Sequence, residues 1–156
     1  DAATAGLDGL IVPDLPVEES AALQDKATRR NLKLIQLITP TTPRARAVEI
    51  ARLTTGFIYY VSVAGITGER KALPEDLKAN VAWLRTQTDL PICIGFGISS
   101  PEQVQELAEV ADGLIVGSAL VRRLADAAPR ARADLVKEIG DFIGSLADAL
   151  NGGASC

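Results

Sequence analysis

Short apolar runs alternate with amphipathic stretches along nearly the whole chain, and this alternation limits the possible folds. The apolar runs predict strands at residues 10–12, 32–38, 57–63, 92–94 and 114–116. The stretches between and after them have helical spacing and predict helices at residues 17–30, 43–53, 74–87, 101–110, 118–125 and 130–150. Strands that alternate with helices indicate a parallel sheet with crossover helices.

A doubly wound sheet and part of a barrel both fit this pattern, and the glycines favour the barrel. A doubly wound nucleotide-binding fold would have a G-x-G-x-x-G loop after its first strand, whereas this chain has Pro13-Asp14-Leu15-Pro16 there. Its glycine-bearing loops come later. We therefore predict that residues 1–150 form the C-terminal five βα units of a (β/α)8 TIM barrel, the phosphate-binding half.

A complete barrel of this kind needs about 250 residues, so the 156 residues would lack about three βα units at the N-terminal side. Residues 1–7 are expected to be the end of a preceding helix. The chain begins with Asp1 and contains no methionine, so we expect the gene to encode sequence before it. Residues 151–156 are expected to be a disordered tail.

Composition excludes several functions. The formal net charge of −4 and the lack of a basic patch argue against nucleic-acid binding. No apolar run is long enough to span a bilayer and the N-terminus does not resemble a signal peptide, so we expect a cytoplasmic protein. Histidine is absent and Cys93 and Cys156 have no metal-ligand spacing, so neither a metal site nor histidine-based catalysis is expected.

Three glycine-bearing loops follow successive predicted strands, at residues 64–68, 95–99 and 117–119. Glycine lets backbone N–H groups converge on a phosphate without an intervening Cβ, and the last two loops lead into helices, whose N-termini favour anions. Any one of these glycines could simply make a tight turn. Three such loops at consecutive strand ends favour a phosphate site.

Other polar residues have two interpretations each. Asp14 follows a strand, where barrel active sites lie, but an aspartate there also suits a helix cap or a loop. Thr67 is either a ligand-facing hydroxyl or a turn residue. Tyr59 and Tyr60 are neighbours in a strand, so one should face the barrel interior and the other the helices.

Four ordered segments resemble the tryptophan synthase alpha chain family. They are residues 8–20 (DGLIVPDLPVEES), 37–43 (LITPTTP), 59–62 with 65–68 (YYVS and GITG) and 95–99 (GFGIS). The resemblance extends from residue 1 to about residue 126. It implies a (β/α)8 barrel that cleaves indole-3-glycerol phosphate to indole and glyceraldehyde 3-phosphate without a cofactor or metal, and a tryptophan synthase beta chain as partner in a heterotetramer of two alpha and two beta chains.

The resemblance also implies roles for the individual residues of this chain that match the family's motifs. Thr67 would belong to the lid over the site. Leu37, Tyr59 and Phe96 would line the indole pocket. The phosphate would be bound around Gly68, Gly97, Ile98, Gly117 and Ser118, with Ala119 adjacent.

The family's catalytic Glu and Asp precede the segment that matches Asp1, so no catalytic residue is expected in this chain. Asp14 is not their equivalent, because that loop lies nearer the partner interface in the family. We therefore expect the 156-residue chain to have no lyase activity by itself. Its first and fifth predicted strands would be open edges, so we expect it to need its N-terminal portion or to self-associate.

Two alternatives remain open at this stage. One is another phosphate-binding barrel enzyme, which would share the last two glycine loops but not the pair formed by residues 39–43 and 65–68. The other is a non-catalytic half-barrel whose role is assembly, which the absence of catalytic carboxylates favours.

Overall fold

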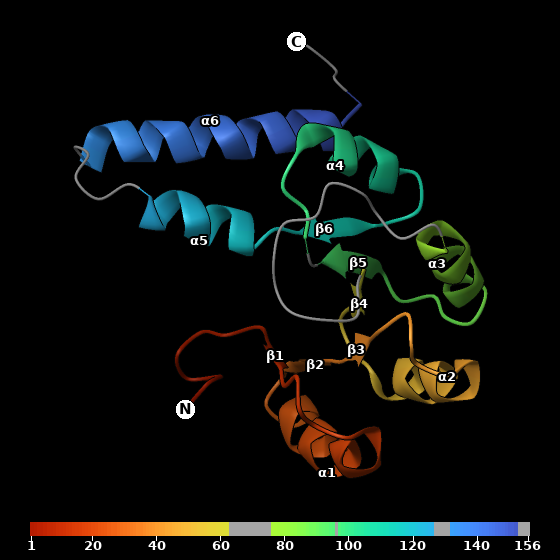
Figure 1. Cartoon of the computed structure of the whole chain (residues 1–156). Helices are drawn as coiled ribbons and strands as arrows, with labels where there is room; N and C mark the ends of the chain where they lie inside the picture. Colours follow the sequence, from red (N-terminus) through yellow and green to blue (C-terminus); the bar gives the residue numbers. More distant parts are fainter. Residues whose placement is uncertain (63–75, 96, 127–131, 153–156) are drawn as a thin grey trace.

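The strands pair only in parallel in the part of the chain that the structure describes (Figure 1). The structure is a computed structural model that describes residues 1–62, 76–95, 97–126 and 132–152. The strands are β1 (Gly9–Ile11), β2 (Lys33–Ile35), β3 (Leu37–Ile38), β4 (Ile58–Val61), β5 (Ile92–Gly95) and β6 (Gly113–Ile115). The helices are α1 (Val17–Thr28), α2 (Arg44–Leu53), α3 (Leu77–Arg85), α4 (Pro101–Ala108), α5 (Ser118–Ala125) and α6 (Arg132–Leu150). The predicted alternation of strands and helices is confirmed.

The prediction of one unbroken strand over residues 32–38 is wrong, because the strand is interrupted at Gln36. β2 pairs with β1, whereas β3 pairs with β4. The backbone nevertheless stays in one layer, since the Tyr59 N–H donates to the Gln36 carbonyl (3.1 Å) and the Thr55 N–H donates to the Leu34 carbonyl (2.9 Å). Gln36 therefore marks the point at which the chain changes its main pairing partner.

The strand pairs define two sheets, β1–β2 and β3–β4–β5–β6. Because β2 and β3 follow each other in one layer, β1 and β6 are the two outer strands among the described residues. In Figure 1 helices α1, α2, α3 and α4 follow one another around one side of the strands. This is the arrangement of an arc of a barrel, in which each crossover helix covers the outer face of the sheet.

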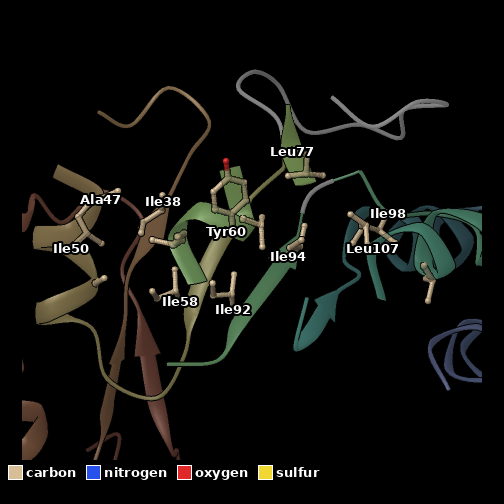
Figure 2. Close-up of a cluster of buried hydrophobic side chains, with 14 of the residues drawn as sticks. Ile38, Ala47, Ile50, Ile58, Tyr60, Leu77, Ile92, Ile94, Ile98 and Leu107 are labelled. Atoms are coloured by element: carbon tan, nitrogen blue, oxygen red, sulfur yellow. The ribbon is translucent and has the colours of Figure 1, made fainter. Parts of the chain in front are cut away.

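The main core lies between the sheet and these helices. Figure 2 shows the side chains of Ile38, Ile58, Tyr60, Ile92 and Ile94 gathered on this face of the strands. Each is at most 2% exposed. Alternate strand residues point to opposite faces, so these positions fix which residues lie on the other face.

The opposite face of the sheet is less covered. Leu37, Tyr59 and Cys93 lie on it and are half-buried, and the Ile11 side chain is 44% exposed. The prediction that Tyr59 and Tyr60 face opposite sides of the sheet is confirmed. A sheet that is buried under helices on one face and partly open on the other has the two faces of an incomplete barrel wall.

The first residues have the hydrogen bonds that end a helix. The Ala5 N–H donates to the Asp1 carbonyl (2.8 Å), the Leu7 N–H donates to the Ala2 carbonyl (3.2 Å), and Gly6 has φ of +82°. A glycine with positive φ between such bonds is the common C-terminal cap of a helix, in agreement with the expectation for residues 1–7.

At the other end, Asn151 continues α6 by donating from its N–H to the Ala147 carbonyl (3.0 Å). Most of the predicted tail, residues 153–156, lies outside the described residues. No helix in the described ranges is long and apolar enough to cross a membrane. Within the same ranges no group of three or more Cys, Asp or Glu side chains is arranged to hold a metal ion.

Asp112 joins β5, β6 and α3. Its carboxylate accepts a hydrogen bond from the Ile92 N–H (2.8 Å) and two from the Arg85 guanidinium (3.1 and 3.0 Å). Its own N–H donates to the Ile92 carbonyl (2.9 Å). The hydrogen bond from the Ile92 backbone, followed by the pairing with Arg85, lowers the pKa of the Asp112 carboxyl below its ordinary value of 3.8.

A lowered pKa in the folded state means that Asp112 stabilises the fold only while it is ionised. This contribution is present above the ordinary pKa of 3.8 and is lost as the pH falls toward the lowered pKa. We predict that Asp112→Asn lowers the free energy of unfolding at neutral pH and makes its decrease between about pH 5 and pH 2 shallower. Urea unfolding at several pH values measures this, with exposed Asp89→Asn as the control. An unchanged pH dependence in Asp112→Asn would contradict the prediction.

Candidate functional site

The C-terminal ends of the parallel strands bring the predicted site segments to one edge of the sheet. After β3 come Thr39 to Thr42, after β5 come Gly97 and Ile98, and after β6 comes Gly117. Because parallel strands end at the same edge, these segments are neighbours, and ligands of α/β sheets bind at this edge. Thr67, Gly68 and Phe96, which were predicted as lid, phosphate and indole residues, lie outside the described residues.

The inner face of the sheet carries one row of register partners. Leu37 pairs with Tyr59, Tyr59 with Cys93, and Cys93 with Gly113. The structure thus brings together two of the three predicted indole-pocket residues, Leu37 and Tyr59, on adjacent strands. Burial raises the pKa of the Tyr59 hydroxyl, so this group is a neutral hydrogen-bond donor at physiological pH.

The Tyr59 ring lies against the backbone of Gly95. A Cβ at position 95 would come within 2.7 Å of the Tyr59 Cζ atom, and closer still to Oη and Cε2. Gly95 is two residues beyond Cys93, the register partner of Tyr59, so the ring leans toward the C-terminal edge. Sequence reasoning grouped Gly95 with the loop glycines, but the structure places it in β5, where its lack of a side chain leaves room for Tyr59.

The N-terminus of α4, after the Gly97 loop, is closed by its own side chains. The Ser100 hydroxyl accepts a hydrogen bond from the Gln103 N–H (3.4 Å), and the Gln103 side-chain carbonyl accepts one from the Ser99 N–H (2.8 Å). Glu102 adds an acidic side chain in the first turn, and its pKa is lowered by a hydrogen bond from Ser100 and by its own backbone. The backbone N–H groups of Ser99 and Gln103, which could otherwise reach a phosphate, therefore already donate to side chains.

Gly97 and Ile98 differ in what they could offer to a ligand. Gly97 has φ of +80°, a conformation that residues with a Cβ rarely adopt, so glycine is required to make this turn. Ile98 is 2% exposed and belongs to the hydrophobic core, as Figure 2 shows. Only the backbone of Ile98, and not its side chain, is available for the role predicted from sequence.

The N-terminus of α5 is different. Gly117 is the residue before the helix, it is exposed, and α5 has no side-chain cap. A Cβ at Gly117 would meet nothing within 4 Å. Ser118 and Ala119 begin the helix, and Ala119 is buried and anchors this end in the core. The first N–H groups of a helix lack intrahelical partners, and together with the helix dipole they favour an anion.

One cavity among the described residues lies at this edge and another lies away from it. The first, of about 190 Å³, lies between the loop after β1 and the start of α2, and Leu37, Thr42 and Arg46 are among the residues that line it. The other, of about 260 Å³, is apolar and lies between β6 and α6. Neither cavity is lined by Tyr59 or Gly117. Asp14 is exposed in the loop after β1.

A parallel α/β arc with its outer face under helices and the predicted site segments at its C-terminal edge has the architecture of part of a (β/α)8 barrel. The tryptophan synthase alpha chain family model matches residues 1–151, and the chain belongs to this family. The resemblance inferred from the motifs is confirmed. A different phosphate-binding barrel enzyme is thereby excluded as the family.

The relatives are longer than this chain. The chain is 58% identical over 154 residues to the tryptophan synthase alpha chain of Rhodopirellula baltica, covering 94% of this chain and 55% of that protein. It is 47% identical over 146 residues to the alpha chain of Geobacter sp. strain M21, covering 94% and 54%. It therefore spans about half the length of the curated relatives that it matches.

Solved structures of this family have the same fold over the matched region. The tryptophan synthase alpha chain of Legionella pneumophila subsp. pneumophila superposes with a TM-score of 0.80 at 34% identity, covering 99% of this chain and 56% of that one. A chain from the tryptophan synthase α2β2 complex of Pyrococcus furiosus gives 0.81 at 32% identity, covering 93% and 57%. The fold thus aligns to about half of a tryptophan synthase alpha barrel.

The contact between Tyr59 and Gly95 generates a prediction about stability. Gly95→Ala should lower the free energy of unfolding by about 1–3 kcal/mol, because the new Cβ overlaps the tyrosine ring. In a Tyr59→Ala background the same substitution should cost far less, since the ring is gone. Urea unfolding of the four proteins of this double-mutant cycle, at one protein concentration, measures the coupling.

Gly117→Ala is the matched control for this cycle, because the added methyl group meets open space. Its cost should be that of an alanine at the residue before a helix, about 0.5–1 kcal/mol, and should be the same with and without Tyr59. Equal costs of Gly95→Ala with and without Tyr59 would show that the ring does not set the requirement for glycine.

Proposed function

We propose that this chain is the C-terminal portion of a tryptophan synthase alpha chain, comprising the last five βα units of the barrel, and that it supplies the phosphate-binding side of the active site. The complete enzyme would cleave indole-3-glycerol phosphate to indole and glyceraldehyde 3-phosphate in tryptophan biosynthesis. The observation that carries this proposal is the match of residues 1–151 to the tryptophan synthase alpha chain family, together with the exposed Gly117 at the N-terminus of α5 directly after β6.

The phosphate would be bound mainly by backbone N–H groups. Gly117 and Ser118 would present the free donors of α5 to the dianion, and Gly97 and Ile98 would add backbone groups from the preceding loop, with Gly68 completing the set. The closed N-terminus of α4 supports this division, since Ser100 and Gln103 already use donors there. Binding this non-reacting part of the substrate orients the bonds that react.

The indole ring would lie against the inner face of the sheet. Leu37 and Tyr59 form a continuous apolar surface there because they are register partners on β3 and β4, and Phe96 would complete the pocket. Gly95 has an indirect role in this proposal, as it leaves the space that the Tyr59 ring occupies.

The proton transfers would need residues from outside this chain. Cleavage requires one group to protonate indole C3 and another to remove a proton from the glycerol hydroxyl. The family's catalytic Glu and Asp would precede Asp1, and Thr67 would support a lid over the site. No metal or organic cofactor takes part in the proposed reaction.

The partner would be a tryptophan synthase beta chain, which would receive the indole in the cytoplasm. One of the solved relatives comes from an α2β2 complex of tryptophan synthase. We propose the same type of heterotetramer for the complete protein to which this portion corresponds.

The first test of this proposal is complementation. We predict that the 156-residue chain alone releases no indole from indole-3-glycerol phosphate, and that adding the separately produced N-terminal part of the Rhodopirellula baltica alpha chain restores turnover. Indole release is measured for each half and for the mixture, with circular dichroism to check that each is folded. Turnover by this chain alone would overturn the proposed division of the active site.

The second test separates phosphate binding from folding. In the complemented protein, Gly117→Ala should weaken binding of glycerol 3-phosphate by about tenfold or more, because in this proposal the phosphate lies against Gly117, in the open space that an added methyl group would enter. Gly144→Ala, which also meets nothing within 4 Å but lies within α6, is the matched control and should leave the affinity unchanged. Isothermal titration calorimetry measures both, and equal affinities would count against the site.

A further inference from the structure

The two buried glutamine side chains in the described part of the chain differ in their hydrogen bonds. Gln103 is 8% exposed, and its side-chain carbonyl accepts hydrogen bonds from the N–H and the hydroxyl of Ser99 (2.8 and 3.3 Å). Gln36 is 7% exposed, but its Nε2 atom is enclosed and has no hydrogen-bond partner among the described residues. A buried amide donor without a partner destabilises the folded state, so its presence needs a physical reason.

Gln36 stands in a row of apolar side chains. Residues alternate between the two faces of the sheet, so Leu34, Gln36 and Ile38 face the helices, and Leu34 and Ile38 are 0% and 2% exposed. The backbone of Gln36 takes part in the sheet, because its carbonyl accepts a hydrogen bond from the Tyr59 N–H (3.1 Å). Packing alone would favour an apolar side chain at this position, so the buried amide indicates a polar group that the chain itself does not provide.

A cavity of about 190 Å³ adjoins Gln36, between the loop after β1 and the start of α2. Leu15, Val17 and Ile50 are among its apolar walls. The residues that line it lie between positions 12 and 50, in two consecutive βα units. A cavity of about 150 Å³ holds one benzene molecule, so this one has room for a molecule of roughly six to nine non-hydrogen atoms.

The polar groups at this cavity carry no net charge. Arg46 lines it, but its guanidinium donates to both carboxylate oxygens of Glu18 (2.6 and 2.9 Å), so the two charges offset each other. The Thr42 hydroxyl oxygen accepts a hydrogen bond from the Thr39 N–H (3.0 Å). An anion would have to displace Glu18 from Arg46, and a cation would meet the Gln36 donor. The lining therefore favours a neutral ligand that has an acceptor atom.

We propose that this cavity binds a small neutral molecule with an acceptor oxygen on an apolar body, such as a ketone, an alcohol or an amide, and that the Gln36 side-chain N–H donates to this oxygen. The side chain of glutamine has three rotatable bonds, so the amide can turn into the cavity when an acceptor is present. The site goes beyond the proposed reaction. Among the described residues predicted to bind the substrate, Leu37 is the one that it shares.

The direct test is a titration that observes Gln36 itself. Cyclohexanone, a neutral ring with a single acceptor oxygen, is added to the ¹⁵N-labelled 156-residue chain. The side-chain amide signal of Gln36, identified as the signal that Gln36→Met lacks, should shift together with the backbone amides of Val17 and Thr42, with a Kd on the order of millimolar. The proposal fails if the Gln36 signal does not shift, or if the saturable shifts are confined to the separate cavity lined by Leu114 and Ile143.

Gln36→Met tests the hydrogen bond to the ligand, since methionine keeps the length of the side chain and removes the donor. The affinity for cyclohexanone, followed by the Val17 and Thr42 signals, should fall at least about fivefold. Without cyclohexanone, the urea midpoint of this variant should be equal to that of the starting protein or higher, because an unpaired buried donor is gone. Unchanged affinity, or a lowered midpoint, would overturn the proposal.

Gln103→Met is the matched control, because Gln103 is buried to the same extent and has its partners within the chain. This variant should have a lower urea midpoint, since the Ser99 N–H loses its acceptor, and should bind cyclohexanone like the starting protein. Equal losses of stability in Gln36→Met and Gln103→Met would show that Gln36 has only a structural role.

Leu15→Trp tests the cavity without changing Gln36. The half-buried Leu15 side chain lines the cavity, and the larger ring should fill part of it and weaken cyclohexanone binding at least about fivefold, with circular dichroism as the check on folding. The same titrations are made after complementation with the N-terminal part of the Rhodopirellula baltica alpha chain, where the affinity should stay within about threefold. Binding that Leu15→Trp leaves intact, or that complementation abolishes, would rule out this cavity as a ligand site of the protein.

Discussion

The fuller burial of one face of the sheet is the constraint on which the rest of this structure depends. Ile58, Ile92 and Ile94 are completely buried under the helices, and this fixes the rotation of β4 and β5 about their axes. Because side chains alternate, the same rotation places Tyr59, Cys93 and Gly95 on the inner face. The candidate indole surface is therefore a consequence of how the outer core packs, and a one-residue shift of register would exchange the two faces.

Side-chain capping distinguishes the two helix N-termini at the candidate site. α4 begins with Ser100 and Pro101, and its side chains use the donors that a ligand would need. α5 begins after Gly117 and has no such cap. A glycine N-cap such as Gly117 costs the helix on the order of a few tenths of a kcal/mol relative to a capping side chain. Leaving the α5 donors free for a ligand therefore costs little stability, and Ala119, buried in the core, holds this end of the helix in place.

The sequence predicted the order and type of the elements well, because apolar periodicity is a local property. It also predicted that Tyr59 and Tyr60 would separate, since alternation needs no knowledge of the neighbouring strands. It could not predict the interruption at Gln36, which arises where the chain changes partner from β1 to β4. Nor could it show that Ile98 is buried or that Gly95 accommodates Tyr59, because both depend on register between strands that are distant in the sequence.

The candidate phosphate site and strand β6 are physically connected, since β6 leads into α5 within two residues, Val116 and Gly117. Pairing of β6 with another strand would restrict the motion of β6 and, through it, the position of the α5 N–H groups. An ordered set of donors binds an anion with a smaller entropic cost than a mobile one. By linkage, any partner that strengthens phosphate binding in this way must itself be bound more tightly when phosphate is present. Pairing of a further strand with β6 and binding of phosphate at the N-terminus of α5 are then thermodynamically coupled.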